Sequence, residues 1–334
     1  VVGSKHGNNN NNNNNVRQRN NILLLLTDDQ DIVLGSFDTS KYMPHLQYHI
    51  QQKGITFEQG AFVHVPICCP SRTSILTGKY LHTQQGMALN NSLSGNCYGE
   101  EWKTTIESKS TFAVYAKQAG YTTLYAGKYL NRYEYNNSTE GGSSSIPNGW
   151  DYWYGLEGNS RYYNYTIVEG FPTTTENNTN GSGITIPTRP PPLLHNHGDI
   201  YPQDYLPLVL QNYTLQKLAI LPEPWLAVIA WPSPHGPFTP EPKYNASSGL
   251  YQTVVPPGNT FPNYNATPAS MQSKHWLLRQ LGIITNTTAN RIDTIYKNRL
   301  RTLKTVDNHI GTLIDLLSVS SPSQSQSQSQ SQSQ

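Results

Sequence analysis

Residues 21–31 read NILLLLTDDQD, an apolar run that leads directly into a cluster of acidic residues. An uninterrupted apolar run of this length is typical of a strand that is buried on both faces, as in a parallel sheet covered by helices. The runs YTTLYA (121–126) and WLAVIAW (225–231) have the same form and are soon followed by Lys128 and His235, respectively. Ligands of open α/β sheets bind outside the carboxyl ends of the strands. The sequence therefore predicts an α/β fold with a large, mostly parallel central sheet flanked by helices, and a site at one edge of it.

The composition of the chain argues against several classes of protein. Its 334 residues are enough to bury a sizeable core, in one large domain or two ordinary ones. The formal net charge of +2 is spread along the chain without a block of Lys and Arg, so we expect no nucleic-acid partner. The longest apolar run is far too short to cross a bilayer, so we also expect no membrane span.

Low-complexity sequence marks both ends of the chain. An asparagine homopolymer lies near the amino terminus, and a Ser-Gln repeat ends the sequence. Neither offers apolar side chains that would offset the entropy lost on ordering, so we expect both ends to be disordered. We predict an Asn-rich disordered segment at 1–19, a folded domain at 20–317 and a low-complexity tail at 318–334, with surface loops at 136–149 and 172–192.

Asp28 and Asp29 follow the first apolar run. Two adjacent carboxylates repel each other unless they share a cation or a proton. Oxygen ligands of this kind favour Ca²⁺ or Mg²⁺ over a thiophilic metal. A solvated turn in which Asp29 caps a helix explains the same two residues, so the pair alone leaves both interpretations open.

Two of the three cysteines stand together in PICCPSRTSILTGKY (66–80). Pro70 suits the first turn of a helix, and Gly78 lies near the end of that helix. The positive end of the helix dipole, its free backbone N–H groups and Arg72 would hold an anion beside the cysteines. A cysteine placed there, such as Cys68, is either an activated thiolate that needs a partnering histidine or a small buried hydrophobe.

The residues around the cysteine pair resemble a known signature. Residues 68–72 (CCPSR), continued by 76–78 (LTG), resemble the C-x-P-S-R…L-T-G signature of the type I sulfatases. The segments LLLTDDQD, AGKYLN and PSPHGPF resemble the first metal-binding strand end, the active-site lysine segment and the active-site histidine segment of that family. The resemblance extends from about Asn20 to Leu317. Within the family, GNC, GKYLN, WYGLEGNSRYYNYT and KHWLLRQ look most like the N-acetylglucosamine-6-sulfatases and the heparan sulfate endosulfatases.

This resemblance implies an alkaline-phosphatase-like sulfatase core and a formylglycine residue made from Cys68 by formylglycine-generating enzyme during secretion. In the family, the formylglycine hydrate attacks sulfur, the sugar alcohol leaves, and the remaining hydroxyl expels sulfate. The implied metal ligands are Asp28, Asp29 and the modified Cys68. They would hold Ca²⁺, with Mg²⁺ as the less favoured ion, and the ion would polarise the sulfate oxygens and acidify the hydrate.

Three other catalytic residues follow from the same resemblance. Arg72 would support the modified residue and its charge, while Lys128 and His235 would bind sulfate and assist the leaving oxygen. Taken alone, a single Lys is usually a solvated surface group, and a His between prolines usually belongs to a loop. In the order that the family has, both indicate catalysis. The implied activity removes 6-O-sulfate from N-acetylglucosamine or glucosamine units of glycosaminoglycans such as heparan or keratan sulfate.

The chain departs from the family pattern in two places. Leu130 stands where many sulfatases carry a His, a variation that the glucosamine-6-sulfatase group shares. The Ser-Asp-Asn-Gly segment that completes the family's metal site, and the Lys beyond it, do not occur in the sequence. Asp307 and Asn308 do not replace that segment, because apolar residues at helical spacing predict a helix over 300–317 with these two toward its polar side. We therefore expect the amino-terminal part of a sulfatase, with weakened Ca²⁺ binding.

Several alternatives stay open at this point. A catalytically incomplete sulfatase-like glycoprotein would bind sulfated sugars without turnover, and a phosphatase or phosphonate hydrolase of the same superfamily would usually have Ser or Thr as its nucleophile. In KHWLLRQ, His275 and Arg279 either contact substrate anions or form the charged edge of a core helix. Once Cys68 is set aside, Cys69 and Cys97 form an even pair that could make a disulfide.

Acceptor sites for N-glycosylation indicate the compartment. Asn-x-Ser/Thr triplets are frequent, and although an Asn-rich chain produces some of them by chance, they favour a lysosomal or secreted glycoprotein. These sites are Asn90, Asn136, Asn137, Asn164, Asn177, Asn180, Asn212, Asn245, Asn265 and Asn286.

Overall fold

The structure is a computed structural model, and the residues that it describes are 19–58, 61–83, 102–135, 146–175, 187–256 and 268–319. Most of the predicted end segments, 1–19 and 318–334, therefore lies outside the described residues, as do parts of both predicted surface loops. Within the described ranges, no helix has the length and apolar character that crossing a membrane requires.

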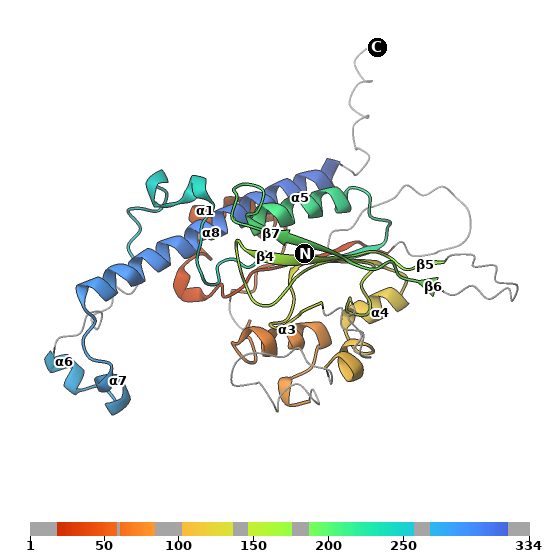
Figure 1. The fold of residues 1–334 in the computed structure, drawn as a ribbon. Helices are drawn as coiled ribbons and strands as arrows, with labels where there is room; N and C mark the ends of the chain where they lie inside the picture. Colours follow the sequence, from red (N-terminus) through yellow and green to blue (C-terminus); the bar gives the residue numbers. More distant parts are fainter. Residues whose placement is uncertain are drawn as a thin grey trace, which may run out of the picture.

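A six-stranded sheet forms the centre of the fold, in the order β1-β8-β2-β3-β4-β7 (Figure 1). The pairs β1–β8, β8–β2 and β2–β3 are parallel, whereas β4 pairs antiparallel with both β3 and β7. The prediction of a mostly parallel sheet is thus confirmed, and the three apolar runs form β1, β2 and β8. The strands are β1 Ile22–Leu26, β2 Thr122–Lys128, β3 Tyr152–Leu156, β4 Tyr165–Gly170, β7 Leu193–His197 and β8 Trp225–Ala230.

Helices cover both faces of this sheet and explain why β1 is apolar throughout. Alternate leucines of β1 belong to different cores, so that Leu23 packs into one hydrophobic cluster and Leu24 against the other. Side chains of successive strand residues point to opposite faces, so both sets must be apolar when both faces are covered. Helices α5 and α8 contribute to the first core, and α3 and α4 to the second (Figure 1). Their bounds are α3 Cys68–Thr77, α4 Phe112–Gln118, α5 Leu206–Leu218 and α8 Asn286–Val319.

Shorter elements connect these parts. The remaining α-helices are α1 Thr39–Tyr42, α2 Pro44–His49, α6 Pro268–Gln272 and α7 Trp276–Gln280, and a small two-stranded sheet joins β5 Thr174–Thr175 to β6 Pro187–Thr188. Short 3-10 segments are η1 Ile32–Leu34, η2 Gln51–Lys53, η3 Leu81–Thr83, η6 Pro242–Tyr244 and η7 Ala246–Ser248, and a π-helical segment is η5 Trp102–Glu107.

The helix predicted over 300–317 is the carboxyl-terminal half of the longer α8. The prediction that Asp307 lies toward the polar side of this helix is wrong, because α8 also packs against α2 and Asp307 is fully buried. Its carboxylate accepts a 3.0 Å bond from the backbone N–H of Leu46 and lies 3.2 Å from Lys304 Nζ. Burial of this carboxylate is tolerated because both of its oxygens have a partner.

Candidate active site

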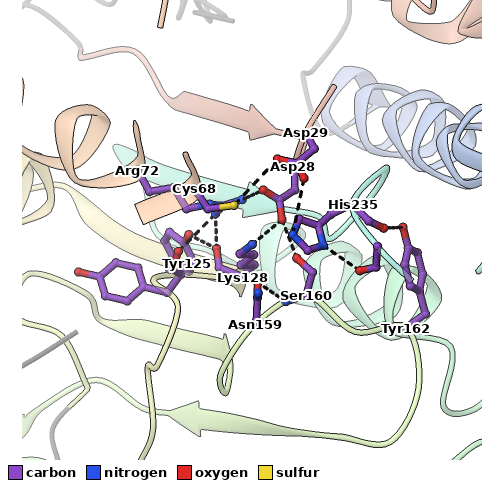
Figure 2. A network of polar contacts seen from close by, with 12 residues as sticks. Asp28, Asp29, Cys68, Arg72, Tyr125, Lys128, Asn159, Ser160, Tyr162 and His235 are labelled. Atoms are coloured by element: carbon purple, nitrogen blue, oxygen red, sulfur yellow. Dashed lines mark hydrogen bonds and ion pairs between the residues drawn. The ribbon is translucent and has the colours of Figure 1, made fainter. Parts of the chain in front are cut away.

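The carboxyl ends of β1, β8 and β2 meet at one edge of the sheet, because these neighbouring strands are parallel. Asp28 follows β1, Lys128 ends β2 and His235 follows β8, while Cys68 begins helix α3 beside them (Figure 2). All the residues predicted for the site therefore lie close together. We call them the site cluster: Asp28, Asp29, Cys68, Arg72, Lys128 and His235.

Gly127 brings Lys128 to this edge. Its φ is 106°, a backbone conformation that residues with a side chain rarely adopt. A Cβ at this position would lie 2.0 Å from the carbonyl oxygen of Ala230 on the neighbouring strand. Glycine therefore allows β2 and β8 to stay paired up to their ends, where Lys128 is fully buried.

Asp28 is a buried carboxylate with a partner at each oxygen. Lys128 Nζ lies 2.6 Å from Oδ2 and Arg72 Nη2 lies 3.4 Å from Oδ1. The hydroxyl of Ser160 donates a second bond to Oδ2, at 2.6 Å. Burial raises the pKa of Asp28, but Arg72 and Lys128 more than offset this and lower the pKa to about 2. Asp28 is therefore ionised, with its charge compensated inside the protein.

Arg72 connects the start of α3 to the end of β2. Its Nη1 donates a 2.6 Å bond to the carbonyl of Lys128, which also accepts a 2.5 Å bond from the hydroxyl of Tyr125. Arg72 lies about one turn into a helix that begins at Cys68. These bonds fix the distance between the buried lysine and the cysteine.

Ser160 was not predicted as a site residue, although it lies in the segment WYGLEGNSRYYNYT that carries part of the family resemblance. It lies in the connection between β3 and β4, where the side chain of Asn159 accepts a 2.8 Å bond from the Ser160 backbone N–H. A single Ser in a loop has no periodicity or charge that would distinguish it. Only the strand order brings it to Asp28.

The paired cysteines have separate environments. Cys68 carries a free thiol at the first position of α3, after Ile67 in an extended conformation, and Gly78 in the left-handed conformation ends the helix. Cys69 is fully buried and disulfide-bonded. The partner predicted for it, Cys97, lies outside the described residues. Cys68 therefore lies at the positive end of the dipole of α3.

Asp29 forms the exposed side of the cluster. Its φ of 63° lies in the left-handed region, which costs a non-glycine residue about 1 kcal/mol. Oδ1 of Asp29 lies 3.9 Å from Cys68 Sγ, and Oδ2 lies 3.6 Å from His235 Nε2. The side chain of Asp29 is 53% exposed, against 4% for Asp28. Of the two adjacent carboxylates, Asp29 is thus the one open to a ligand.

The orientation of His235 is set by its own loop. Its Nδ1 lies 2.8 Å from the carbonyl of Gly236, and because a carbonyl only accepts, Nδ1 carries a proton. Nε2 therefore faces Asp29 and the thiol of Cys68. A hydrogen bond with Cys68 raises the pKa of His235 above its ordinary value, by more than burial lowers it. The protonated form, with Nε2–H as a proton donor, is favoured accordingly.

The site cluster contains carboxylate oxygens, which a hard cation prefers, but fewer of them than such a cation needs. One ligand atom from each of Asp28, Cys68 and His235 lies within 4.8 Å of the other two. The carboxylates of Asp28 and Asp29 are of the class that Ca²⁺ and Mg²⁺ take, but Ca²⁺ takes about 6–8 oxygen ligands. Within the described ranges, the cluster offers only part of a calcium site.

Two residues that the sequence left open lie apart from the cluster. His275 caps the amino-terminal end of α7 and Arg279 lies in its last turn, on a helix that Figure 1 places well away from α3. Trp276 and Leu277 of the same helix are about half exposed, at 53% and 52%. The segment KHWLLRQ is therefore neither a core helix nor a part of the site cluster in this structure.

Comparisons with known proteins identify relatives of the whole matched region rather than of single site residues. Residues 20–323 match the family described as Sulfatase. The N-acetylglucosamine-6-sulfatase of Homo sapiens is 39% identical over 293 residues, which are 87% of this chain and 46% of that protein. The putative extracellular sulfatase Sulf-1 homolog of Caenorhabditis elegans is 34% identical over 296 residues, which are 87% of this chain and 35% of that protein. The chain thus spans about half the length, or less, of these relatives.

A solved structure shares the fold. Its protein was studied in complex with its substrate, D-glucosamine-2-N,6-O-disulfate, and it superposes with a TM-score of 0.56 at 17% sequence identity. The match covers 90% of this chain and 62% of that one. At this identity the likeness concerns the fold alone.

Proposed function

This chain belongs to the sulfatase family, and we propose that it acts in the removal of 6-O-sulfate from N-acetylglucosamine or glucosamine units of glycosaminoglycans. The observation that carries the proposal is Cys68 at the start of α3, surrounded by two carboxylates, two buried cations and a histidine. A helix start and buried cations together stabilise an anionic ester and the charge that develops on it. The choice of the 6-sulfate rests on the relative that is 39% identical.

The nucleophile in this proposal is Cys68 after oxidation to formylglycine by formylglycine-generating enzyme. Hydration of the aldehyde places two hydroxyls on one carbon. One hydroxyl attacks sulfur while the sugar alcohol leaves, and loss of the proton from the other expels sulfate and restores the aldehyde. The carboxylate of Asp29, 3.9 Å from Sγ of the unmodified residue, is near enough to take a proton from the hydrate.

The other members of the cluster would bind and protonate. Arg72 would compensate charge at position 68, and Lys128 would contact a sulfate oxygen. His235 would give the proton on Nε2 to the departing sugar oxygen, a role that needs its protonated form. The bond between Nδ1 and the carbonyl of Gly236 suits this role, because it holds the ring with Nε2 directed toward position 68.

We further propose that Asp28, Asp29 and the modified Cys68 hold Ca²⁺, which would polarise the sulfate oxygens and acidify the hydrate. Lys128 lies 2.6 Å from one oxygen of Asp28, whereas Arg72 lies 3.4 Å from the other. The oxygen of Asp28 that faces Arg72 therefore has the weaker contact, and it is the one that would bind the ion. Within the described residues, these three supply only part of the roughly 6–8 oxygen ligands, water included, that Ca²⁺ takes.

We propose a lysosomal or secreted location and N-glycosylation for the protein. Formylglycine is made in the secretory pathway, and Asn-x-Ser/Thr triplets recur along the chain. The description of one relative as an extracellular sulfatase supports the same route. The substrate would then be a sulfated glycosaminoglycan or a sulfated glucosamine derived from it.

The test is sulfate release by protein expressed through a secretory pathway. Peptide mass spectrometry should find formylglycine at position 68, and the protein should release sulfate from glucosamine 6-sulfate but not phosphate from the corresponding phosphate ester. The Cys68→Ala variant should fold and release no sulfate. Binding of the sulfated sugar by the modified protein without release would instead identify a sulfated-sugar-binding glycoprotein. Release of phosphate in preference to sulfate would identify a phosphatase.

A further inference from the structure

Helix α8 makes direct contact with the backbone of the site cluster. Arg299 Nη2 donates a 2.6 Å hydrogen bond to the carbonyl oxygen of Asp29. The same guanidinium pairs with the carboxylate of Asp31, two residues further along. The next residue of the helix, Leu300, is fully buried in the core, so the guanidinium projects from a firmly packed part of α8.

The same helix holds the following residues of this segment as well. Tyr296, nearly one turn before Arg299, donates a 2.7 Å bond from its hydroxyl to the carbonyl of Leu34. Asp31 in turn accepts a 2.9 Å bond from the backbone N–H of Leu34, which caps the 3-10 segment Ile32–Leu34. Residues 29–34 are thus attached to α8 at both ends.

From these contacts we infer that Arg299 is a positioning residue, which holds Asp29 in the conformation that presents its carboxylate to Cys68 and to a bound cation. The inference rests on the proposed function of the cluster. The left-handed conformation costs Asp29 about 1 kcal/mol, although Asp adopts it more readily than most residues, so contacts that hold it favour the observed conformation. The guanidinium supplies one at the carbonyl, while the carboxylate stays free to face Cys68 and His235.

Substitution of Arg299 should therefore loosen the acidic segment without unfolding the domain. In Arg299→Gln, backbone amides of residues 29–34 should exchange hydrogen faster, while those of the buried half of α8 should keep their protection. Affinity for Ca²⁺, measured by calorimetry, should fall about tenfold or more, the usual effect of removing a residue that orients a ligand. Sulfate release should lose kcat, because a displaced Asp29 takes a proton from the hydrate less effectively.

Conservative and matched variants separate positioning from bulk stability. Arg299→Lys keeps one donor and should recover part of the Ca²⁺ affinity, whereas Asp31→Asn keeps the bond to the Asp29 carbonyl and should have the smaller effect. Arg291→Gln changes an exposed arginine on the same helix and should leave every readout unchanged. If Arg299→Gln fails to fold, Arg299→Lys and Asp31→Asn still distinguish the two contacts.

The outcomes separate this inference from the proposed function. Wild-type binding of Ca²⁺ together with equal binding and equal amide exchange in Arg299→Gln would overturn the positioning role. A wild-type protein that binds no Ca²⁺ and releases no sulfate would contradict the proposed function. In that case the exchange of residues 29–34 still decides the inference, since faster exchange in Arg299→Gln supports the attachment and unchanged exchange removes it.

Discussion

Two polar networks lie beside β8, and they differ in whether one of their side chains is exposed to solvent. The site cluster contains a compensated carboxylate, Asp28, next to an exposed one, Asp29. The second network, which we call the His309 network, consists of His309, Trp231 and Thr214, all of them buried. Trp231 Nε1 donates to His309 Nδ1 at 3.0 Å, and Thr214 Oγ1 lies 2.9 Å from His309 Nε2.

The His309 network is neutral and fully satisfied. Because Nδ1 accepts from Trp231, the proton of the neutral ring is on Nε2 and is donated to Thr214, whose own hydroxyl donates to the carbonyl of Leu210 at 2.7 Å. Burial lowers the pKa of His309 to about 3, so the ring stays uncharged. The comparison indicates that a closed neutral network serves stability, whereas charges with an open side indicate a binding site.

The largest expected effect comes from the buried ion pair. Lys128→Met leaves Asp28 with only Arg72 and Ser160, and breaking such a pair costs about 3–5 kcal/mol of unfolding free energy. Sulfate release should fall at least about 100-fold. Denaturant unfolding and initial rates measure the two quantities.

A double variant tests whether the pair serves stability or chemistry. Asp28→Asn combined with Lys128→Met removes both charges but leaves Arg72 without its carboxylate partner, so it should recover only part of the stability lost by Lys128→Met and none of the sulfate release. Recovery of both would show that the site cluster is structural, like the His309 network. Loss of stability equal to the sum of the single variants would show that the two residues do not interact.

The next effect should be confined to stability. His309→Phe keeps a ring of similar size but leaves the indole N–H of Trp231 buried without an acceptor, at a cost of about 1–3 kcal/mol. Trp231→Phe in the same chain removes the unsatisfied donor but leaves a cavity, so the two substitutions together should cost less than the sum of the two alone. Sulfate release per folded molecule should stay at the wild-type value in both variants. A lower rate per folded molecule would contradict the structural role of this network.

The two networks should also respond to acid in different pH ranges. The folded pKa of His309, about 3, lies below the ordinary value of 6.5, so the unfolded chain binds this proton first and stability falls as pH drops from 6.5 to 3. The slope is at most about 1.4 kcal/mol per pH unit for one proton. For Asp28, with a pKa of about 2 against 3.8, the loss occurs between about pH 4 and pH 2.

Unfolding free energies of wild type and His309→Phe at a series of pH values measure this difference. Relative to wild type, the variant should lack the loss that His309 causes between pH 6.5 and pH 4.5, while Glu107, with a pKa of about 7, contributes with the opposite sign in both proteins. Both proteins should keep the loss below pH 4. An unchanged slope in the variant would place the titrating group elsewhere.

The sequence predicts the elements of this fold more completely than their arrangement. The three apolar runs locate β1, β2 and β8, because strands covered on both faces must be apolar throughout. That β8 lies between β1 and β2 is a matter of strand order, which no local pattern contains. The candidate site residues after the strands are therefore predictable as a set from the family signature, whereas the contacts that they make with one another are not.

Residues that act across long sequence separations show the same limit. Ser160 is 132 positions from Asp28, and Arg299 is 270 positions from Asp29. Helical periodicity places Asp307 on the polar side of α8 because it considers one helix alone, whereas α2 covers that side in the fold. Helical periodicity predicts the face of a helix that packs against one neighbouring element. Only the structure shows that a second element packs against another face of the same helix.

The smallest expected effects come from removing one hydroxyl from each network. These two substitutions give the most direct comparison of the site cluster with the His309 network. Ser160→Ala removes one of two donors to Oδ2 of Asp28, and Thr214→Val removes the acceptor of His309 Nε2–H, each at about 1 kcal/mol of unfolding free energy. The hydroxyl of Ser160 also lowers the pKa of Asp28, so Ser160→Ala should raise that pKa. Loss of a bond that orients Asp28 should slow sulfate release, whereas Thr214→Val should leave the rate unchanged. Carboxyl carbon NMR titration and initial rates measure the two quantities. Wild-type rates of sulfate release in both variants would mean that Ser160 only stabilises the fold. The site cluster and the His309 network would then not differ in the role of a single hydrogen bond.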